Sequence, residues 1–161
     1  MIQAPDLPGR DTARAMSQEN VEVVRSFLEP FAGINVAAVD WGTEAVGERL
    51  RRAYSPDVEL RTLASGIGTG VSESYRGLDG LVRYLGEWLG PFGEYHVEWL
   101  DYIAVGDWVV VPTRQWGVGS TSGARAELEL VHAYKLRDGK IVRLDQYDTV
   151  EEALEAAGLS E

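Results

Sequence analysis

The chain has 161 residues, which is enough for one domain, since a domain near 150 residues buries roughly two thirds of its unfolded-chain surface. Its formal net charge of -11 and its scattered arginines exclude the basic footprint of a nucleic-acid-binding domain. Because it has no cysteine, it can form neither a disulfide nor a cysteine-ligated metal site.

The sequence carries no sign of a membrane or secretory segment. No apolar run approaches the ~18 residues needed to span a bilayer, and "MIQAPDLPGRDTARA" lacks the apolar core of a secretory signal. We therefore expect a soluble, cytoplasmic protein that has no membrane partner. The same fifteen residues lack periodicity, which predicts a poorly ordered extension, residues 1–15, ahead of a single domain at residues 16–161.

Apolar residues at helical spacing predict three helices in the first ninety residues. The first helix begins at the N-cap Ser17 and is broken by Pro30. Thr43 is the predicted N-cap of the second helix, and Gly90 and Pro91 end the third. The third helix has the heaviest apolar stripe, which consists of Leu81, Leu85, Trp88, Leu89 and Phe92.

Strands are predicted where the apolar period changes to two. "VELRTL" forms one short strand, and the Gly/Ser-rich "ASGIGTGVSES" after it predicts a mobile flap. Four further strands are predicted at 95–104, 108–118, 125–137 and 140–147, and they form an antiparallel meander. Thr149 and Glu152 then make a capping-box pattern for a terminal helix that covers one end of the sheet. This order of elements is typical of an α+β fold with helices gathered on one face of the sheet.

Three segments in this order, "MSQENVEVVRSFLEPF", "YRGLDGLVRYLGEWLGPF" and "AYKLRDGKIVRLDQYDTVEEALEAAGL", resemble the SnoaL-like branch of the nuclear-transport-factor-2-like superfamily. The resemblance covers most of residues 16–161. It implies a cone-shaped roll, in which a curved, mainly antiparallel sheet wraps against three helices, plus a short C-terminal helix and an apolar cavity. Such relatives include polyketide cyclases, ketosteroid isomerases and non-catalytic binding domains, so the fold does not decide the function.

The resemblance also implies a homodimer. In support, several apolar side chains are predicted on the sheet face opposite the helices, such as Val109, Val111 and Val131. An apolar face without helices to cover it would suit a subunit interface.

The segment "ELELVHAYKL" places His132 on the leucine face of its strand. Its neighbours depend on the following hairpin turn, because a slip of one residue moves every side chain to the other face. With a two-residue turn His132 faces Asp145, whereas with a three-residue turn it faces Leu144 and has Gln146 as a diagonal neighbour. We favour the three-residue turn, because the alternative buries the charge of Arg143.

The resemblance bears on the same positions. Where similar cyclases have a catalytic aspartate, this chain has Gln146, which cannot transfer a proton. Where ketosteroid isomerases have an oxyanion-stabilising aspartic acid and a general base, this chain has His132 and Leu60. These differences leave open whether the protein is an enzyme.

The candidate site therefore centres on His132, as a buried structural imidazole or as a general acid or base. Asp148 is the second catalytic candidate, and otherwise an ordinary carboxylate at a strand end. Arg114 points either into the cone or into a subunit interface. The predicted ligand-binding residues are Gln146, Tyr54, Tyr134, Trp88, Trp116, Arg114 and Leu144.

No cofactor and no metal are expected, because the two histidines lie on separate strands without ligand spacing. We expect the chain to bind a small, largely apolar molecule in its cavity, with cofactor-free acid/base isomerase, cyclase or lyase activity as one possibility. The alternative is a non-catalytic ligand-binding or dimeric interaction module.

Overall fold

The computed structural model describes residues 8–63 and 72–159. Within these residues seven strands form one sheet in the order β2-β1-β7-β6-β5-β3, and β4 pairs with β5. The strands are β1 (Tyr54–Arg61), β2 (Ser74–Arg76), β3 (Phe92–Trp99), β4 (Ile103–Val105), β5 (Trp108–Gly119), β6 (Arg125–Arg137) and β7 (Lys140–Tyr147).

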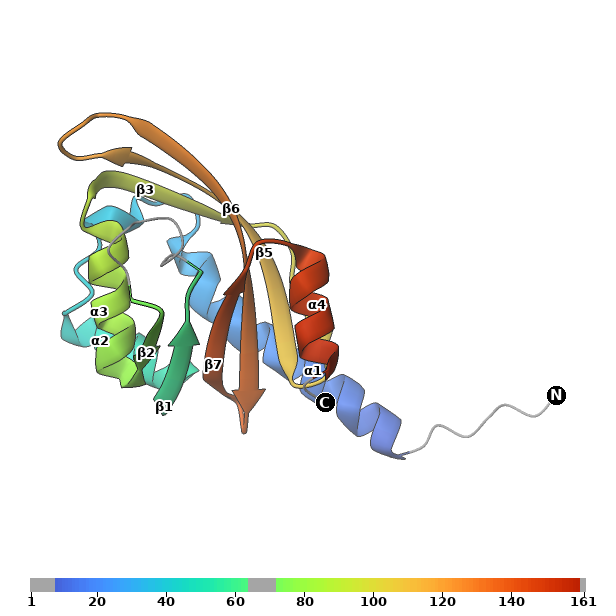
Figure 1. Ribbon diagram of the computed structural model, residues 1–161. Coiled ribbons are helices and arrows are strands. Elements are labelled where there is room, and N and C mark those ends of the chain that lie inside the picture. The colour runs from blue at the N-terminus through green and yellow to red at the C-terminus, as the bar shows by residue number, and fades with distance from the viewer. Residues whose placement is uncertain (1–7, 64–71, 160–161) are drawn as a thin grey trace.

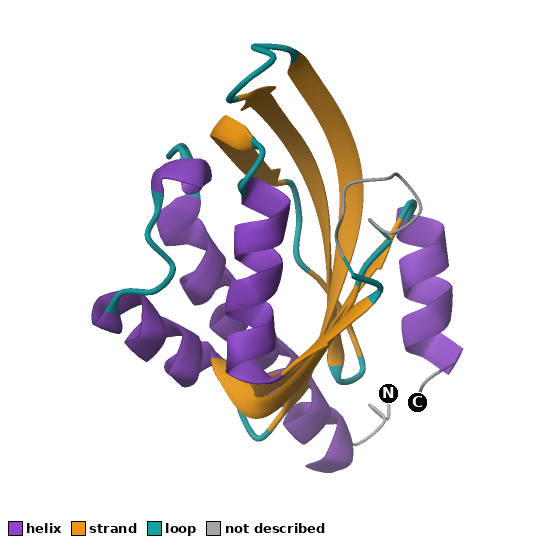
Figure 2. Cartoon of the chain, turned by 60° about the vertical axis from the view of Figure 1, so that its left-hand side comes forward, coloured by secondary structure: helices purple, strands orange, loops and turns teal. Residues whose placement is uncertain are grey.

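The helices cover both faces of this curved sheet unequally (Figures 1 and 2). They are α1 (Pro8–Leu28), α2 (Glu44–Ala53), α3 (Gly77–Leu89) and α4 (Val150–Leu159), with 3₁₀ turns η1 (Glu29–Phe31) and η2 (Val36–Ala38). The first three lie on the concave side, which we call the inner face, and α4 lies on the other side, the outer face. All the strand pairs are antiparallel except β1 with β7, which confirms the α+β cone.

Two helix starts differ in how well the sequence predicted them. Helix α1 begins at Pro8, so Ser17 lies within the helix and the predicted N-cap was wrong. At α2 the prediction is confirmed, since the Thr43 hydroxyl oxygen accepts a hydrogen bond from the Val46 amide at 3.3 Å. The domain boundary at residue 16 stays a prediction.

The predicted strand at 95–104 is two strands, β3 and β4. Between them the Asp101 carboxylate accepts a hydrogen bond from the Tyr102 amide at 2.8 Å, a local bond that competes with the ladder. The short edge strand β2 was missed, because three residues are too few to show a period. The predicted flap falls mainly on residues 64–71, which lie outside the described residues.

The β6–β7 hairpin combines a two-residue turn with a bulge, so the predicted three-residue turn was wrong. Asp138 and Gly139 have φ angles of 53° and 75°, as a two-residue turn of this kind requires. Val142 is then unpaired, and the register shifts by one residue. His132 consequently lies directly opposite Gln146, neither opposite Asp145 nor diagonal to Gln146.

The outer face of the sheet carries only one of the three valines that the dimer argument used. Val109 and Val111 belong to the inner core, paired across β5–β6 with Tyr134 and His132. Val131 does face outward, but it packs in a cluster that contains Ala153 and Ala157 of α4. The apolar-face argument for a dimer was therefore wrong, because α4 covers this face and not one end of the sheet.

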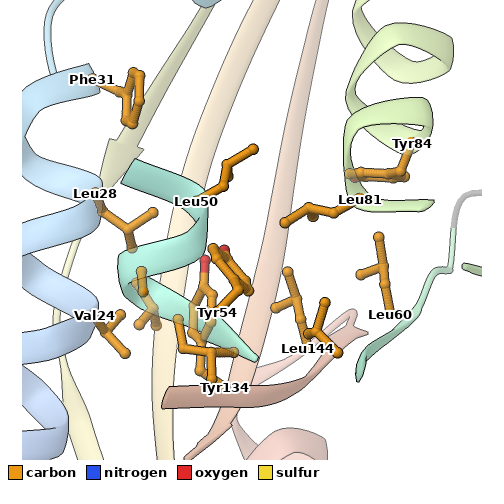
Figure 3. Close-up of a cluster of buried hydrophobic side chains, with 14 of the residues drawn as sticks. Val24, Leu28, Phe31, Leu50, Tyr54, Leu60, Leu81, Tyr84, Tyr134 and Leu144 are labelled. Carbon is orange, nitrogen blue, oxygen red and sulfur yellow. The ribbon is translucent and has the colours of Figure 1, made fainter. Parts of the chain in front are cut away.

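The main core lies between the inner face and the three covering helices. Figure 3 shows Leu28 of α1, Leu50 of α2 and Leu81 of α3 directed toward the sheet, around Tyr54 and Tyr134. All five side chains are buried. Residues far apart in the sequence thus close one apolar interior.

Gly117 of β5 provides a test of how tightly this interior is packed. A β-carbon at Gly117 would lie 2.6 Å from Cδ2 of Tyr95 and 2.8 Å from Cδ1 of Phe92. Gly117→Ala is therefore expected to lower the free energy of unfolding by about 1–3 kcal/mol, measured by urea denaturation. Gly86→Ala on α3, where no atom lies within 4 Å, should instead raise it by about 0.5–1 kcal/mol. Equal effects of the two substitutions would contradict this packing.

Candidate functional site

A cavity of about 110 Å³ lies between the inner face of the sheet and helices α1, α2 and α3. Aliphatic and aromatic side chains make up most of its wall. The aromatic ones are Phe27, Phe31, Trp41, Tyr54, Tyr84, Trp88, Tyr95, Trp99 and Tyr134. Among the described residues, no aspartate or glutamate lines it. The cavity therefore offers a ligand apolar surface and few polar contacts.

His132 is the one histidine among the described residues of this wall. Part of its ring faces the cavity, and its Nδ1 lies 3.4 Å from the hydroxyl oxygen of Tyr134. Its Nε2 is buried and has no partner among the described residues. Burial lowers the pKa of His132 from 6.5 to about 4, so the imidazole is neutral near pH 7.

Gln146 of β7 lies directly opposite His132 on the neighbouring strand β6. Both the oxygen and the nitrogen of its side-chain amide form hydrogen bonds within the protein. Its Nε2 donates to the Tyr84 hydroxyl at 2.7 Å, and its Oε1 accepts from the Leu63 amide at 3.2 Å. These bonds hold α3 and the end of β1 to the centre of the sheet. Gln146 thus has a structural task in addition to lining the cavity.

A series of buried hydrogen bonds leads from the cavity wall into the sheet. The Tyr95 hydroxyl donates to Oε1 of Gln115 at 2.6 Å, and Nε2 of Gln115 donates to the Thr113 hydroxyl at 2.9 Å. Thr113 in turn donates to the Leu130 carbonyl at 2.7 Å. These hydrogen bonds pair polar groups that would otherwise be costly to bury.

Burial also fixes the protonation of the cavity tyrosines. It raises the pKa of Tyr84 to about 12, although the hydrogen bond from Gln146 opposes the shift. The pKa values of Tyr54 and Tyr134 are raised further, again chiefly by burial. These hydroxyls therefore stay neutral at physiological pH.

The structure brings six of the nine predicted site residues to the cavity wall: His132, Gln146, Tyr54, Tyr134, Trp88 and Leu144. It does not bring Arg114, Trp116 or Asp148 there. Arg114 lies on the exposed outer face, with its Nε 3.9 Å from a carboxylate oxygen of Glu129. Asp148 is exposed just after β7.

Trp116 belongs to a small stack on the outer face. Its ring lies 4.3 Å from the ring of His96, nearly parallel to it at 17°. The Arg125 guanidinium lies 4.3 Å from the centre of the Trp116 ring. This side chain therefore stabilises the extended β5–β6 hairpin and its neighbour β3.

Sequence reasoning missed Trp41, Tyr84 and Gln115 as wall residues. Tyr84 could have been found, because it lies four residues before Trp88 on α3. Gln115 alternates with Val109 and Val111, whose face was assigned wrongly. Trp41 lies in a segment without periodicity, so its sequence gives no signal.

The described residues hold no group of three or more histidine, aspartate or glutamate side chains that could bind a metal ion. Within residues 8–63 and 72–159, no helix has the length and apolar character required to cross a bilayer.

Comparison with known families decides the classification. The model of the SnoaL-like domain family matches residues 36–144, which include all the strands apart from the C-terminal end of β7, residues 145–147. The chain belongs to this family. None of the curated proteins matches this SnoaL-like domain.

Solved structures share the fold of this SnoaL-like domain. TerC, co-crystallised with polyporic acid, is 22% identical with a TM-score of 0.63, over 86% of this chain and 98% of that one. A candidate SnoaL-like polyketide cyclase from Jannaschia sp. CCS1 is 17% identical with a TM-score of 0.64, over 97% and 98% of the two chains. A protein of ketosteroid isomerase-like fold from Catenulispora acidiphila DSM 44928, in complex with trimethylamine, is 14% identical with a TM-score of 0.58, over 85% and 92%.

Proposed function

We propose that this SnoaL-like domain binds a small, neutral, largely apolar molecule in the cavity. The observation that carries the proposal is the cavity wall itself, which is mostly aromatic and aliphatic and has no carboxylate among its described residues. A charged ligand would lose its hydration there without gaining a charged partner. A neutral ligand gains from the burial of apolar surface.

The volume limits the size of the ligand. A cavity of ~150 Å³ lined by apolar side chains accepts benzene. The present cavity, about 110 Å³, is smaller, so one six-membered ring approaches the upper limit unless side chains move. A multi-ring molecule would require the covering helices to shift.

Similar structures support a binding role without defining the ligand. Two of them hold a small organic molecule, polyporic acid in TerC and trimethylamine in the Catenulispora protein. At sequence identities of 22% and 14%, these structures support a shared fold but do not indicate that this chain binds the same ligand.

Acid/base chemistry of the isomerase, cyclase or lyase type is the second candidate. The position of His132 on the cavity wall favours it, because this imidazole would lie beside a bound substrate. A pKa of about 4 opposes it, since a general base works best when its pKa lies near the operating pH. The described wall also supplies no carboxylate as a second titrating group, so binding is the better supported function.

A titration with a small neutral ketone tests the binding proposal. Cyclohexanone, a neutral one-ring ketone, is added to protein with ¹³C-labelled leucine methyl groups and followed by NMR. We expect saturable shifts at the wall residues Leu50, Leu81 and Leu144, and none at Leu100, which is 48% exposed. The binding proposal fails if shifts do not saturate or if only exposed leucines respond.

A matched pair of variants locates the ligand. Leu144→Phe fills the cavity and should abolish saturable binding, whereas Leu100→Phe at an exposed position should not. Exchange of the α-hydrogens of cyclohexanone in deuterated water reports turnover in the same samples. Acceleration by the protein that is lost in His132→Leu would establish the enzymatic candidate instead.

We also propose a homodimer, as the family resemblance implies. The outer face of the β5–β6 hairpin beyond α4 would then form the interface, since it carries both Trp116 and the charged pair of Arg114 and Glu129. Sedimentation velocity should give the mass of two chains at micromolar concentration, and Trp116→Glu should give the mass of one. A wild-type protein that sediments as one chain contradicts the proposal.

A further inference from the structure

The free edge of strand β3 carries backbone groups that point away from the sheet. Within the described sheet β3 pairs with β5 alone, so it forms one end of the strand order. The Leu100 amide donates to the Pro112 carbonyl beside β3 at 2.9 Å. Since residues of an antiparallel strand alternate in bonding to their neighbour, Glu98 also bonds to β5, whereas Val97 and Trp99 direct their N–H and C=O groups to the edge.

The side chain of Asn35 already bonds to this edge near the start of β3. Its Oδ1 accepts a hydrogen bond from the Tyr95 amide at 2.8 Å, and its Nδ2 donates to the Gly93 carbonyl at 3.1 Å. An asparagine side chain thus takes the place of a pairing strand there. In residues 8–63 and 72–159, no hydrogen bond of this kind reaches the edge side of Val97 or Trp99. The edge therefore stays open to pairing at these two residues.

A surface groove of about 540 Å³ follows this open part of the edge. Its lining includes Val97 and Trp99, which pack against the inner core, and also Glu98 and Leu100, which alternate with them and are exposed. A groove lined by both sets runs along the edge of the strand and not along one face of the sheet. The other lining residues are Glu29, Ala32, Gly33 and Tyr102.

The charge of the groove distinguishes a second copy of this chain from a different partner. Among the described lining residues there is no lysine, arginine or histidine, and Arg114, opposite Glu98 on β5, lies near Glu129 instead. If β3 of a second copy paired here, Val97 of each chain would face Trp99 of the other, and the two Glu98 side chains would lie directly opposite. Like charges in that position are destabilising, whereas a basic residue there is attracted.

We propose that the edge of β3 binds an extended segment of another protein as an added antiparallel strand. The antiparallel direction is that of the pairs between β3, β4, β5 and β6. Two residues of the segment exchange backbone hydrogen bonds with Val97 and Trp99, and a lysine or arginine between them lies opposite Glu98. Binding at this edge requires no ligand in the cavity.

Fluorescence anisotropy with labelled peptides tests the proposal. The peptide Thr-Val-Lys-Val-Thr, blocked at both ends, should bind about fivefold more tightly than its counterpart with a central glutamate. In Glu98→Lys the preference should reverse, whereas Glu48→Lys, at an exposed position of α2, should leave it unchanged. N-methylation of both valines removes the amide donors that pair with β3 and should abolish binding.

Amide hydrogen exchange locates the bound strand. An excess of the lysine peptide should slow exchange at Val97 and Trp99 but not at Glu98, whose amide already bonds to β5. The proposal is overturned if no peptide binds, if neither N-methylation nor the charge at Glu98 has an effect, or if Val97 and Trp99 exchange as before. Slower exchange of these two amides at higher protein concentration, without peptide, would identify a second copy as the occupant and also overturn it.

Discussion

Leu50→Ala is expected to lower the free energy of unfolding by about 2–5 kcal/mol. Leu50 is 2% exposed and is directed from α2 into the core that Figure 3 shows. The substitution removes buried methyl groups and enlarges a cavity that already exists, so little compensating collapse is expected. Chemical denaturation with urea measures the change.

The same variant links stability to binding. Leu100→Ala, at a position 48% exposed, is the matched control and should change stability by no more than about 0.5 kcal/mol. Saturating cyclohexanone should restore part of the stability of Leu50→Ala, because a ligand of the folded state stabilises it in proportion to the logarithm of its concentration. Similar losses in the two leucine variants would contradict the assigned core.

Acidification from pH 6.5 to pH 4 is expected to destabilise the wild-type protein through His132 by about 3 kcal/mol. The folded protein lowers the pKa of this imidazole from 6.5 to about 4 by burial. Since one pKa unit corresponds to about 1.4 kcal/mol, the full shift amounts to about 3.5 kcal/mol. Slightly less is lost between pH 6.5 and pH 4, because the unfolded state is half protonated at the upper limit and the folded state at the lower one.

The sign follows from which state binds the proton. Above pH 6.5 neither state is protonated at His132, so the residue adds no pH dependence there. As the pH falls below 6.5 the unfolded chain takes up a proton that the folded chain takes up only near pH 4, and unfolding becomes more favourable.

The measurement is the difference between two stability curves. Urea denaturation of wild type and His132→Leu at several pH values cancels the contributions of the carboxylates, which both proteins share. The wild type should lose stability relative to the variant as the pH falls from 6.5 to 4. Parallel curves would show that His132 is solvated and is not part of an enclosed wall.

The hairpin of β6 and β7 shows what the sequence can predict. Alternating residues predicted both strands with their observed bounds, and His132 was expected on the inner face, although the turn between the strands was expected to have three residues and has two. The bulge at Val142 could not be predicted, because valine fits a regular strand as well as a bulged one. Its effect was to bring Gln146 directly opposite His132.

Strand β5 shows the opposite outcome. Trp108, Val109, Val110 and Val111 are all buried, because α4 covers one face of the sheet and the other helices cover the second. A strand buried on both faces has no two-residue period to read, so its inner face was assigned wrongly. Trp41 could not be predicted as part of the cavity wall for a related reason, since only tertiary packing brings it there.

Diffraction from crystals soaked in cyclohexanone tests the central claim most directly, because it locates the ligand. The account predicts electron density for one ring between the inner face of the sheet and α1, α2 and α3, in contact with Leu50 and Leu144. Density confined to the protein surface, with the cavity unchanged, would contradict the account.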